Sequence, residues 1–264
     1  MMKTTNRFFT AIAVSALLIS MPSFSQEDDR PDYVSVTTMY WNKDYNASMA
    51  EWKAAEKEYM EKVTKKNEHI MGSSYHTHLL TPNSNEIMYI QVYPTWEDID
   101  KAAARSAELE KEAWPDADAR KTFLEKMNSA YASYHSDEIY ATLPGAKQPK
   151  GEMSKDMILY MRTNKMAYPE DGNNKEYDEL NKKYIENVIN KNDLIIGYWP
   201  GVHGWGHDKR DFIEFFMIDS LGDLDKMFEK NSELSKAAFT EEESKAFGKY
   251  FRSHGDAVYT SIKL

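Results

Sequence analysis

Hydrophobic and polar positions along this chain alternate between the spacing of strands and the spacing of helices. Residues 33–41 (YVSVTTMYW) are rich in the β-branched and aromatic side chains that strands favour. Residues 46–67 contain strong helix formers and place apolar side chains about one helical turn apart. Residues 70–80 and 86–93 are two extended runs around the turn sequence Pro-Asn-Ser-Asn, which indicates a hairpin.

Three further elements follow this hairpin. Thr95 with Asp98 three residues later resembles a capping box and predicts the start of a helix. Another helix is expected over about residues 118–134, and a last strand over residues 138–143. The predicted order is β-α-β-β-α-β, which is that of the ferredoxin-like split unit.

The same order of elements occurs again later in the chain. When the sequence is shifted by 125 residues, a long stretch aligns with itself without a gap. The matches include Glu51 with Glu176, Tyr59 with Tyr184, Gly72 with Gly197, His78 with His203, and Glu108-Leu109 with Glu233-Leu234. After a deletion in the second copy, residues 135–140 (HSDEIY) match residues 254–259 (HGDAVY). The chain therefore contains an internal duplication.

We expect an α+β protein in which two tandem ferredoxin-like βαββαβ units pack their antiparallel sheets into one α/β barrel. The units are predicted at residues 33–143 and 156–264, with a Pro- and Gly-containing linker at residues 144–155. This duplicated order resembles the dimeric α/β-barrel superfamily over nearly all of the chain that follows the first 32 residues. The resemblance implies relatives that include small cofactor-independent monooxygenases, haem-degrading enzymes and stress-response proteins. It also implies a monomer that forms an internal pseudo-dimer.

The N-terminus has the features of a secretory signal peptide. Lys3 and Arg7 precede a short apolar core, and Ser25 provides a small residue before Gln26. We expect residues 1–25 to be removed, residues 26–32 to form an acidic leader, and the protein to be periplasmic or secreted. Removal changes the net charge from −10 to −12, which disfavours nucleic acid and anionic membrane as partners. The chain has no Cys, so disulfides are excluded.

Strand alternation separates two faces of each predicted sheet. Apolar residues of the third strands are expected to contact the helices: Met88, Ile90, Val92, Ile213, Phe215 and Met217. The opposite face would line the barrel interior and contribute a ligand-binding set made of Tyr89, Gln91, Tyr140, Tyr160, Arg162, Glu214 and Tyr259. Arg162 and Glu214 would have to pair there, because an unpaired buried charge is costly. The alternative is a polar contact between the sheets without a ligand.

Several histidines are candidates for chemistry. His76 and His78 are two residues apart on one predicted strand, and His78 recurs as His203. The spacing of His76 and His78 suits two ligands on one metal, but there is no Cys and no carboxylate has a ligand spacing beside them, so we prefer hydrogen-bonded structural histidines and predict no metal. We consider His78 and His203 as candidate general bases. His135 and His254 also recur, and each is expected to bond the free carbonyls at a helix end.

The segment 198–207 (YWPGVHGWGH) combines three Gly with two Trp and two His. Trp199 and Trp205 offer flat, rigid surfaces for a planar ligand. The alternative is an edge strand whose Trp residues cap the mouth of the barrel.

Three functional hypotheses follow. The first is an exported protein that binds a small, planar or aromatic molecule. The second is an enzyme like the cofactor-independent monooxygenases or haem-related members of the resembled superfamily. The third is a structural or stress-associated module without a ligand. No cofactor and no definite enzyme class is predicted.

Overall fold

The structure is a computed structural model that describes residues 30–151 and 153–264. The predicted signal peptide and the first part of the acidic leader lie outside the described residues. Within the described residues, no helix is both long and apolar enough to cross a membrane.

The first unit contains four strands and three helices in the predicted order. They are β1 (Tyr33–Tyr40), α1 (Met49–Lys62), β2 (Gly72–Leu80), β3 (Glu86–Tyr93), α2 (Trp96–Ala113), α3 (Ala117–Asn128) and β4 (Ser136–Thr142), with a 3₁₀ turn at Thr64–Lys66. The helix predicted over residues 118–134 is shorter than expected, because the chain after Asn128 turns so that Tyr131 pairs with Trp41.

The second unit repeats this arrangement. It contains β5 (Met157–Met166), α4 (Asn174–Tyr184), a π-helical segment η2 (Ile185–Ile189), β6 (Gly197–Trp205), β7 (Asp211–Ile218), α5 (Leu224–Ala238), α6 (Glu241–Gly248) and β8 (Phe251–Ile262), with a 3₁₀ turn at Leu221–Asp223. Strands β6 and β7 begin and end 125 residues after β2 and β3. The duplication seen in the sequence is therefore also a duplication of structure.

The helices begin where side chains can bond the first free amides. Ser48, Thr95 and Thr240 each form a full capping box with the acidic residue three positions later. Such a box satisfies two of the amides that a helix start leaves without a partner. The capping box predicted at Thr95 is thus confirmed.

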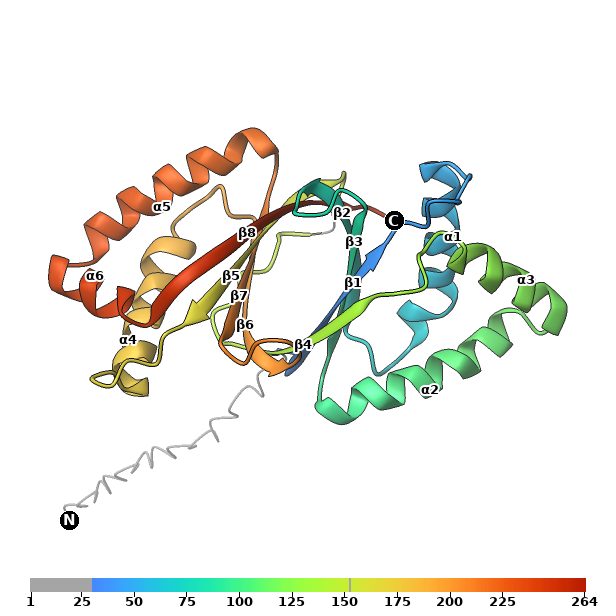
Figure 1. The fold of residues 1–264 in the computed structure, drawn as a ribbon, viewed down its shortest axis with the longest axis horizontal. Coiled ribbons are helices and arrows are strands. Elements are labelled where there is room, and N and C mark those ends of the chain that lie inside the picture. Colours follow the sequence, from blue (N-terminus) through green and yellow to red (C-terminus); the bar gives the residue numbers. More distant parts are fainter. Residues whose placement is uncertain (1–29, 152) are drawn as a thin grey trace, which may run out of the picture.

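The eight strands form one closed antiparallel barrel in the order β1-β3-β2-β8-β5-β7-β6-β4. Two seams join the units, one between β2 and β8 and the other between β4 and β6. The helices of the first unit cover one side of the barrel and those of the second unit cover the opposite side (Figure 1). The predicted fold class is confirmed: two tandem ferredoxin-like units close one α/β barrel.

The barrel interior is mostly apolar. Its core joins strand residues of both units and includes no helix residue: Val34, Val36, Met88, Tyr140, Met157, Leu159, Ile213, Phe215, Met217 and Tyr259. The prediction that Met88, Ile213 and their strand neighbours contact the helices is therefore wrong. The space between two facing sheets is enclosed on all sides, so it takes the most apolar face of each sheet.

The outer face of each sheet packs against helices. In the first unit, Tyr75 and Ile87 pack around Trp52 of α1. In the second unit, Tyr160 and Phe216 pack with Met227 of α5 and with η2. The residues predicted to line the barrel interior from β3, β5 and β7 lie on this outer face instead.

The linker between the units is attached to the second unit. The backbone of Lys147 exchanges two hydrogen bonds with that of Tyr198 on β6, at 2.8 and 2.9 Å. The Lys147 ammonium also donates to the carbonyl of Asn192 at 2.9 Å, beyond the end of η2. These bonds fix the linker against β6.

Candidate functional site

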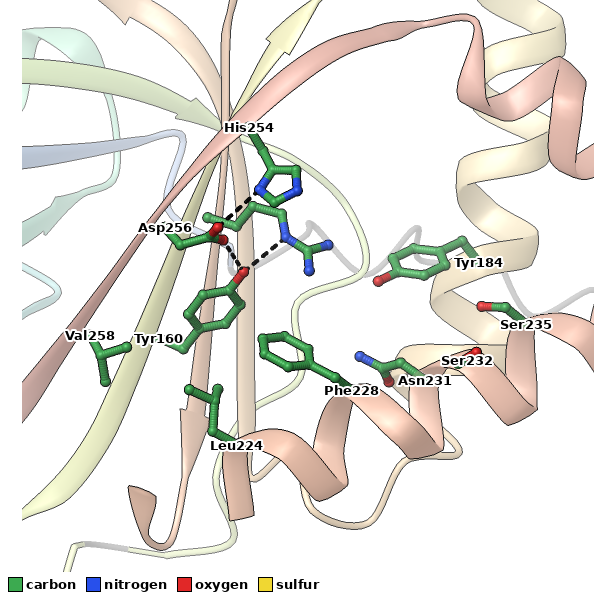
Figure 2. A pocket seen from close by; sticks show the side chains of 11 residues that line it. Tyr160, Tyr184, Leu224, Phe228, Asn231, Ser232, Ser235, His254, Asp256 and Val258 are labelled. Carbon is green, nitrogen blue, oxygen red and sulfur yellow. Dashed lines mark hydrogen bonds and ion pairs between the residues drawn. The ribbon is translucent and has the colours of Figure 1, made fainter. Parts of the chain in front are cut away.

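A cavity of about 610 Å³ lies between the outer face of the second unit's sheet and its helices. Strands β5 and β8 form one wall, and α5 with the end of α4 forms the other. Figure 2 shows Tyr160, Asp256 and His254 on the strands, across the cavity from helix side chains that include Tyr184, Phe228 and Asn231. The other residues that line it are Arg162, Leu224, Ser232, Ser235 and Val258.

Arg162 supplies the positive charge of this cavity. Its side chain is 25% exposed, and its Nε–H donates to the Tyr160 hydroxyl at 3.0 Å. Burial alone would lower the pKa of the guanidinium, but the charge of Glu214 and the nearby tyrosines outweigh this effect and raise the pKa. Arg162 therefore stays charged, and its guanidinium, which also interacts with the Tyr184 hydroxyl, keeps N–H donors for another acceptor.

Glu214 is the acidic partner of Arg162. Its carboxylate is 5% exposed, and its Oε2 lies 3.9 Å from Arg162 Nη1 across the β5–β7 ladder. Glu214 also accepts hydrogen bonds from the Tyr198 hydroxyl at 2.8 Å and from Asn164 Nδ2 at 2.9 Å. The predicted pairing of Arg162 with Glu214 is confirmed, but the distance is too long for a hydrogen bond. The pair is thus an electrostatic contact that leaves the guanidinium free to bond elsewhere.

A chain of polar contacts runs from the cavity to its rim. The Tyr160 hydroxyl, which accepts from Arg162, donates to Asp256 Oδ1. The other oxygen of Asp256 lies 3.1 Å from Nδ1 of His254, whose side chain is about half exposed. Burial raises the pKa of the Tyr160 hydroxyl, with Arg162 opposing this shift, so the hydroxyl is protonated at neutral pH. This series of polar contacts links the guanidinium of Arg162 to the imidazole of His254, which contacts solvent.

Aromatic rings surround the guanidinium. The Arg162 Cζ lies 5.6 Å from the ring centre of Tyr160, 5.9 Å from that of Phe216 and 6.0 Å from that of Phe228. These distances are within the range of cation–π attraction. The cavity thus combines one cation with flat apolar walls, which suits a ligand with an aromatic ring and an acidic group.

The first unit provides an internal comparison, because the equivalent positions carry different residues. Thr37 and Tyr89 pair across β1 and β3 at the register that Arg162 and Glu214 occupy across β5 and β7. Tyr89 stacks on Tyr75 with ring centres 4.4 Å apart and is covered by α1. The first unit therefore places packed aromatic rings where the second unit has a charged pair.

The helix side of the cavity differs as well. In the first unit the Tyr59 hydroxyl donates to Glu110 of α2 at 2.8 Å. The residues 125 positions later are Tyr184 and Ser235, and both line the cavity. Ser235 is too short to replace Glu110, so the second unit keeps open space where the first unit has a filled contact.

The helix that carries Tyr184 also changes its winding at this residue. The π-helical segment η2 begins directly after Tyr184, with the amide of Asn190 bonded to the carbonyl of Ile185. Single π-helical turns inside α-helices occur frequently at functional sites. The equivalent helix α1 is followed by a 3₁₀ turn instead, so the wider turn is confined to the unit with the cavity.

The ligand-binding residues predicted from sequence are divided among several places. Tyr160 and Arg162 line the cavity and Glu214 lies behind them, but on the helix side of the sheet rather than inside the barrel. Gln91 also lies on the outer face of the barrel, where it accepts a hydrogen bond from Tyr93 at 2.9 Å. Tyr140 and Tyr259 do lie in the barrel interior. Whether these residues bind a ligand stays a prediction.

His78 and His203, the predicted bases, lie at opposite seams of the barrel. His78 pairs with Tyr259 across β2 and β8, and His203 pairs with Tyr140 across β6 and β4. His78 Nδ1 contacts the Thr81 hydroxyl at 2.8 Å. Neither histidine lines the 610 Å³ cavity.

The segment 198–207 is not an edge strand, because β6 pairs with β7 on one side and with β4 on the other. Trp199 packs against the interior core and lies 3.3 Å from Gln148 through its indole nitrogen. Trp205 is 66% exposed at the end of β6. The two Trp rings therefore do not form one surface with the cavity.

His135 and His254 do not bond helix ends as predicted. Helices α3 and α6 end at Asn128 and Gly248, several residues earlier. Each histidine instead contacts the aspartate two residues later at 3.1 Å, which is Asp137 in the first unit and Asp256 in the second. The pair of the first unit lies at the start of β4, and the pair of the second unit lies within β8.

The sequence reasoning missed Asp256 and the helix residues Tyr184, Phe228 and Ser235 as members of one site. A usable signal was present in the alignment of the two copies. Arg162 stands at the position of Thr37, and Ser235 stands at that of Glu110. Compared with the first copy, the second copy thus has an additional charge on a strand and lacks a charge on the facing helix. This difference between the copies would have indicated the location of the cavity.

No group of three or more His, Cys, Asp or Glu side chains within residues 30–151 and 153–264 is arranged to hold a metal ion.

Comparisons with known proteins identify the fold. No protein-family model matches the chain, and no curated protein resembles it in sequence. Among solved structures, a provisionally assigned monooxygenase from Fusobacterium nucleatum subsp. nucleatum ATCC 25586 aligns with 89% of this chain and 94% of its own, at 13% identity and a TM-score of 0.57. A provisionally assigned monooxygenase from Lactobacillus acidophilus NCFM aligns with 89% and 95%, at 9% identity and a TM-score of 0.58.

A mutant form of the chlorite dismutase from Candidatus Nitrospira defluvii is also similar. It covers 88% of this chain and 91% of its own, at 11% identity and a TM-score of 0.52. All three similarities extend over both units, so the chain has the tandem dimeric α/β-barrel fold.

Proposed function

We propose that this chain is an exported protein that binds a small aromatic acid in the cavity of its second unit. The observation that carries the proposal is the Arg162 guanidinium, which faces the cavity with Glu214 3.9 Å behind it. A carboxylate of the ligand would accept two parallel hydrogen bonds from Arg162, the geometry that guanidinium groups favour. The aromatic ring of the ligand would pack against Phe228 and Tyr160, whose own rings are in edge-to-face contact with their centres 5.2 Å apart.

The binding can be tested with 4-hydroxybenzoate as the probe and its uncharged amide as the comparison. In ¹H–¹⁵N NMR spectra of the protein, the acid should shift the Arg162 Nε–H and the Ser235 amide in a saturable manner. The amide should bind at least about tenfold more weakly, because a hydrogen bond to a charged group contributes roughly 1.5–3 kcal/mol. Arg162→Gln should remove the preference for the acid.

Arg210→Gln is the matched control, because Arg210 lies in the same unit but pairs with Asp208 outside the cavity. It should leave the titration unchanged. Equal shifts in the Arg162→Gln protein, or no saturable shift of the cavity residues, would remove the support for ligand binding and favour a structural module.

Export is a separate part of the proposal and has its own test. The positive start, apolar core and Ser25 support cleavage before Gln26. N-terminal sequencing of the protein recovered from outside the cytoplasm should give Gln26 as the first residue. An intact Met1 in that fraction would contradict cleavage.

A second candidate function is oxidation of a hydroxylated aromatic compound by O₂. The observation that favours it is the polar chain from Arg162 through Tyr160 and Asp256 to the rim residue His254, which could carry a proton out of the cavity. In such a reaction a ring CH₂ becomes a C=O, and the second oxygen atom of O₂ leaves as water. The fold neighbours assigned as monooxygenases are compatible with this class.

Oxygen uptake with an anthrone as substrate tests this candidate. His254→Ala should slow turnover if the polar chain is used, whereas a His78→Ala/His203→Ala double variant tests the bases predicted from sequence. If the unaltered protein consumes no oxygen with this substrate, the enzyme hypothesis is wrong. This result would not affect the proposed binding function.

A further inference from the structure

A buried histidine lies in the barrel interior. It belongs to the first unit and lies on the face of the sheet opposite to the cavity. His76 is 2% exposed and lies in the middle of β2. Its Nε2 lies 2.7 Å from the Ser74 hydroxyl. Its Nδ1 is buried and has no hydrogen-bond partner within the described residues.

A buried polar nitrogen without a partner is unfavourable, at roughly 1–3 kcal/mol. If Ser74 accepts from Nε2–H, then Nδ1 carries a lone pair. A neutral imidazole with one nitrogen fixed by a hydrogen bond and the other carrying a lone pair is the form that binds metals.

The strand register places two thioethers in the same row of residues as His76. Met88, His76, Ser261 and Met157 lie directly opposite one another across β3, β2, β8 and β5. Residues opposite each other on neighbouring strands have their side chains on one face, about 5 Å apart at Cβ. Met88 and Met157 belong to the interior core, so the whole row faces the interior.

A third sulfur comes from the linker. Met153 packs against the same interior core, and its Sδ lies 4.0 Å from the Ser261 hydroxyl, beside His76 in the row. Met153 is only partly buried, so it connects the row to the surface of the barrel. Met88 is thus the direct neighbour of His76 on β3, and the Met153 sulfur contacts Ser261, the direct neighbour of His76 on β8.

We propose that His76 Nδ1 and the thioethers of Met88 and Met153 form a binding site for a soft monovalent metal ion, Cu(I) or Ag(I). Thioether sulfur with imidazole nitrogen selects soft ions over Zn²⁺, Mg²⁺ or Ca²⁺. The buried carboxylate on the same face of β3, Glu86, already accepts a hydrogen bond from the Tyr259 hydroxyl. The site would be specific to the first unit's half of the barrel. The residues 125 positions after His76 and Met88 are Gly201 and Ile213, which offer no ligand atom.

Silver nitrate is the probe that tests the site, because Ag(I) is stable in air. Isothermal titration of the full chain in chloride-free buffer should show one Ag(I) per molecule, and ¹⁵N NMR should show a large shift of the His76 Nδ1 resonance. A Met88→Leu/Met153→Leu double variant should bind at least about tenfold more weakly, since even indirect changes at metal sites cost 10–100-fold in affinity.

The variants are chosen so that folding does not decide the result. Leu for Met conserves volume and typically costs less than about 1.5 kcal/mol. The control Met49→Leu/Met71→Leu removes two thioethers that are 48% exposed and should leave the affinity unchanged. Equal loss in the control, equal affinity in the Met88/Met153 variant, or no shift of His76 Nδ1 would overturn the proposal.

Discussion

Arg162 and Glu214 face each other across β5 and β7, with Nη1 of one 3.9 Å from Oε2 of the other. The carboxylate is almost fully buried and accepts its hydrogen bonds from Tyr198 and Asn164, not from Arg162. The arginine is held in place by charge while its donors stay directed to the cavity. This arrangement differs from a closed bidentate ion pair, in which the two partners would use each other's bonding capacity.

Replacing Glu214 should therefore be strongly destabilising. Glu214→Ala leaves Arg162 without its counter-charge and leaves the Tyr198 hydroxyl and the Asn164 amide without an acceptor. Removing one partner of a buried ion pair typically costs about 3–5 kcal/mol. Urea denaturation monitored by circular dichroism measures the free energy of unfolding of the variant.

Glu97→Ala is the matched control for this measurement. Glu97 pairs with Lys101 on the surface of α2, where its side chain is 75% exposed. Exposed pairs contribute little, so the midpoint in urea should not move. A Glu214→Ala protein as stable as the control would mean that the buried pair is not required for folding.

Refilling the cavity should abolish binding without loss of stability. Ser235→Glu restores the residue that the first unit has at this position, where Glu110 accepts from Tyr59 at 2.8 Å. The new carboxylate would accept from Tyr184, occupy the cavity and repel an anionic ligand. Titration with 4-hydroxybenzoate should show no binding, whereas thermal unfolding should occur at or above the original midpoint.

The reciprocal change is the control for this design. Glu110→Ser in the first unit removes the Tyr59 contact but leaves Tyr89 and Tyr75 stacked in place. It should not create a second binding site. Unaltered binding in the Ser235→Glu protein would show that the ligand does not use this part of the cavity.

The linker should be sensitive to substitution at one glycine and tolerant at another. Gly145 has φ = 97°, and a Cβ there would lie 2.6 Å from Cδ1 of Ile185, the buried first residue of η2. Gly151 has φ = 89° but has nothing within 4 Å of an added Cβ. Both alanine variants carry backbone strain, and only Gly145→Ala adds a clash that typically costs about 1–3 kcal/mol. Equal urea midpoints for the two variants would contradict close packing of the linker.

The fold could be predicted from the sequence because the duplication presents each local strand, helix and turn pattern twice. A strand pattern at residues 33–41 alone is ambiguous, but the same order of elements 125 residues later leaves few alternatives. The hairpin between β2 and β3 and the cap at Thr95 depend on local chemistry, which sequence patterns report well. Closure of the barrel follows from pairing two similar sheets.

The location of the site could not be predicted in the same way. Alternation assigns Met88 and Tyr89 to opposite faces of β3, but both faces are largely apolar, so it does not say which face is inside. The choice depends on how the two units dock, which is a long-range property. The sequence identifies Tyr160 and Arg162 as candidates. It does not predict which helix residues lie opposite them, because this depends on how α5 packs on the sheet.

His76 should make the stability of the protein depend on pH. Its pKa is about 3 in the folded protein, because burial disfavours the charged ring, and about 6.5 in the unfolded chain. The unfolded chain therefore binds an additional proton below about pH 6.5. The contribution of the neutral ring is fully present above that pH and is lost as the pH falls toward 3.

The expected slope is up to about 1.4 kcal/mol per pH unit between pH 6.5 and 3. Because carboxylates also titrate in this range, the quantity to measure is the difference between the unaltered protein and His76→Leu in urea unfolding at each pH. This difference should shrink or reverse in favour of the variant as the pH falls. A difference that does not change with pH would mean that His76 is protonated, or accessible, in the folded state.

The second unit by itself should form a homodimer. In the full chain its interior face, which includes Leu159, Phe215 and Met217, is covered by the first unit. Its strands β6 and β8 pair with β4 and β2, so both would be unpaired edges in the isolated unit. Because the two seams are related by the duplication, β6 of one copy can pair with β8 of another, and two identical units can close one barrel. Light scattering with size-exclusion chromatography of residues 153–264 should give twice the mass of one unit. A folded monomer with the same circular dichroism per residue would show that the barrel interior does not need to be closed for this unit to be stable.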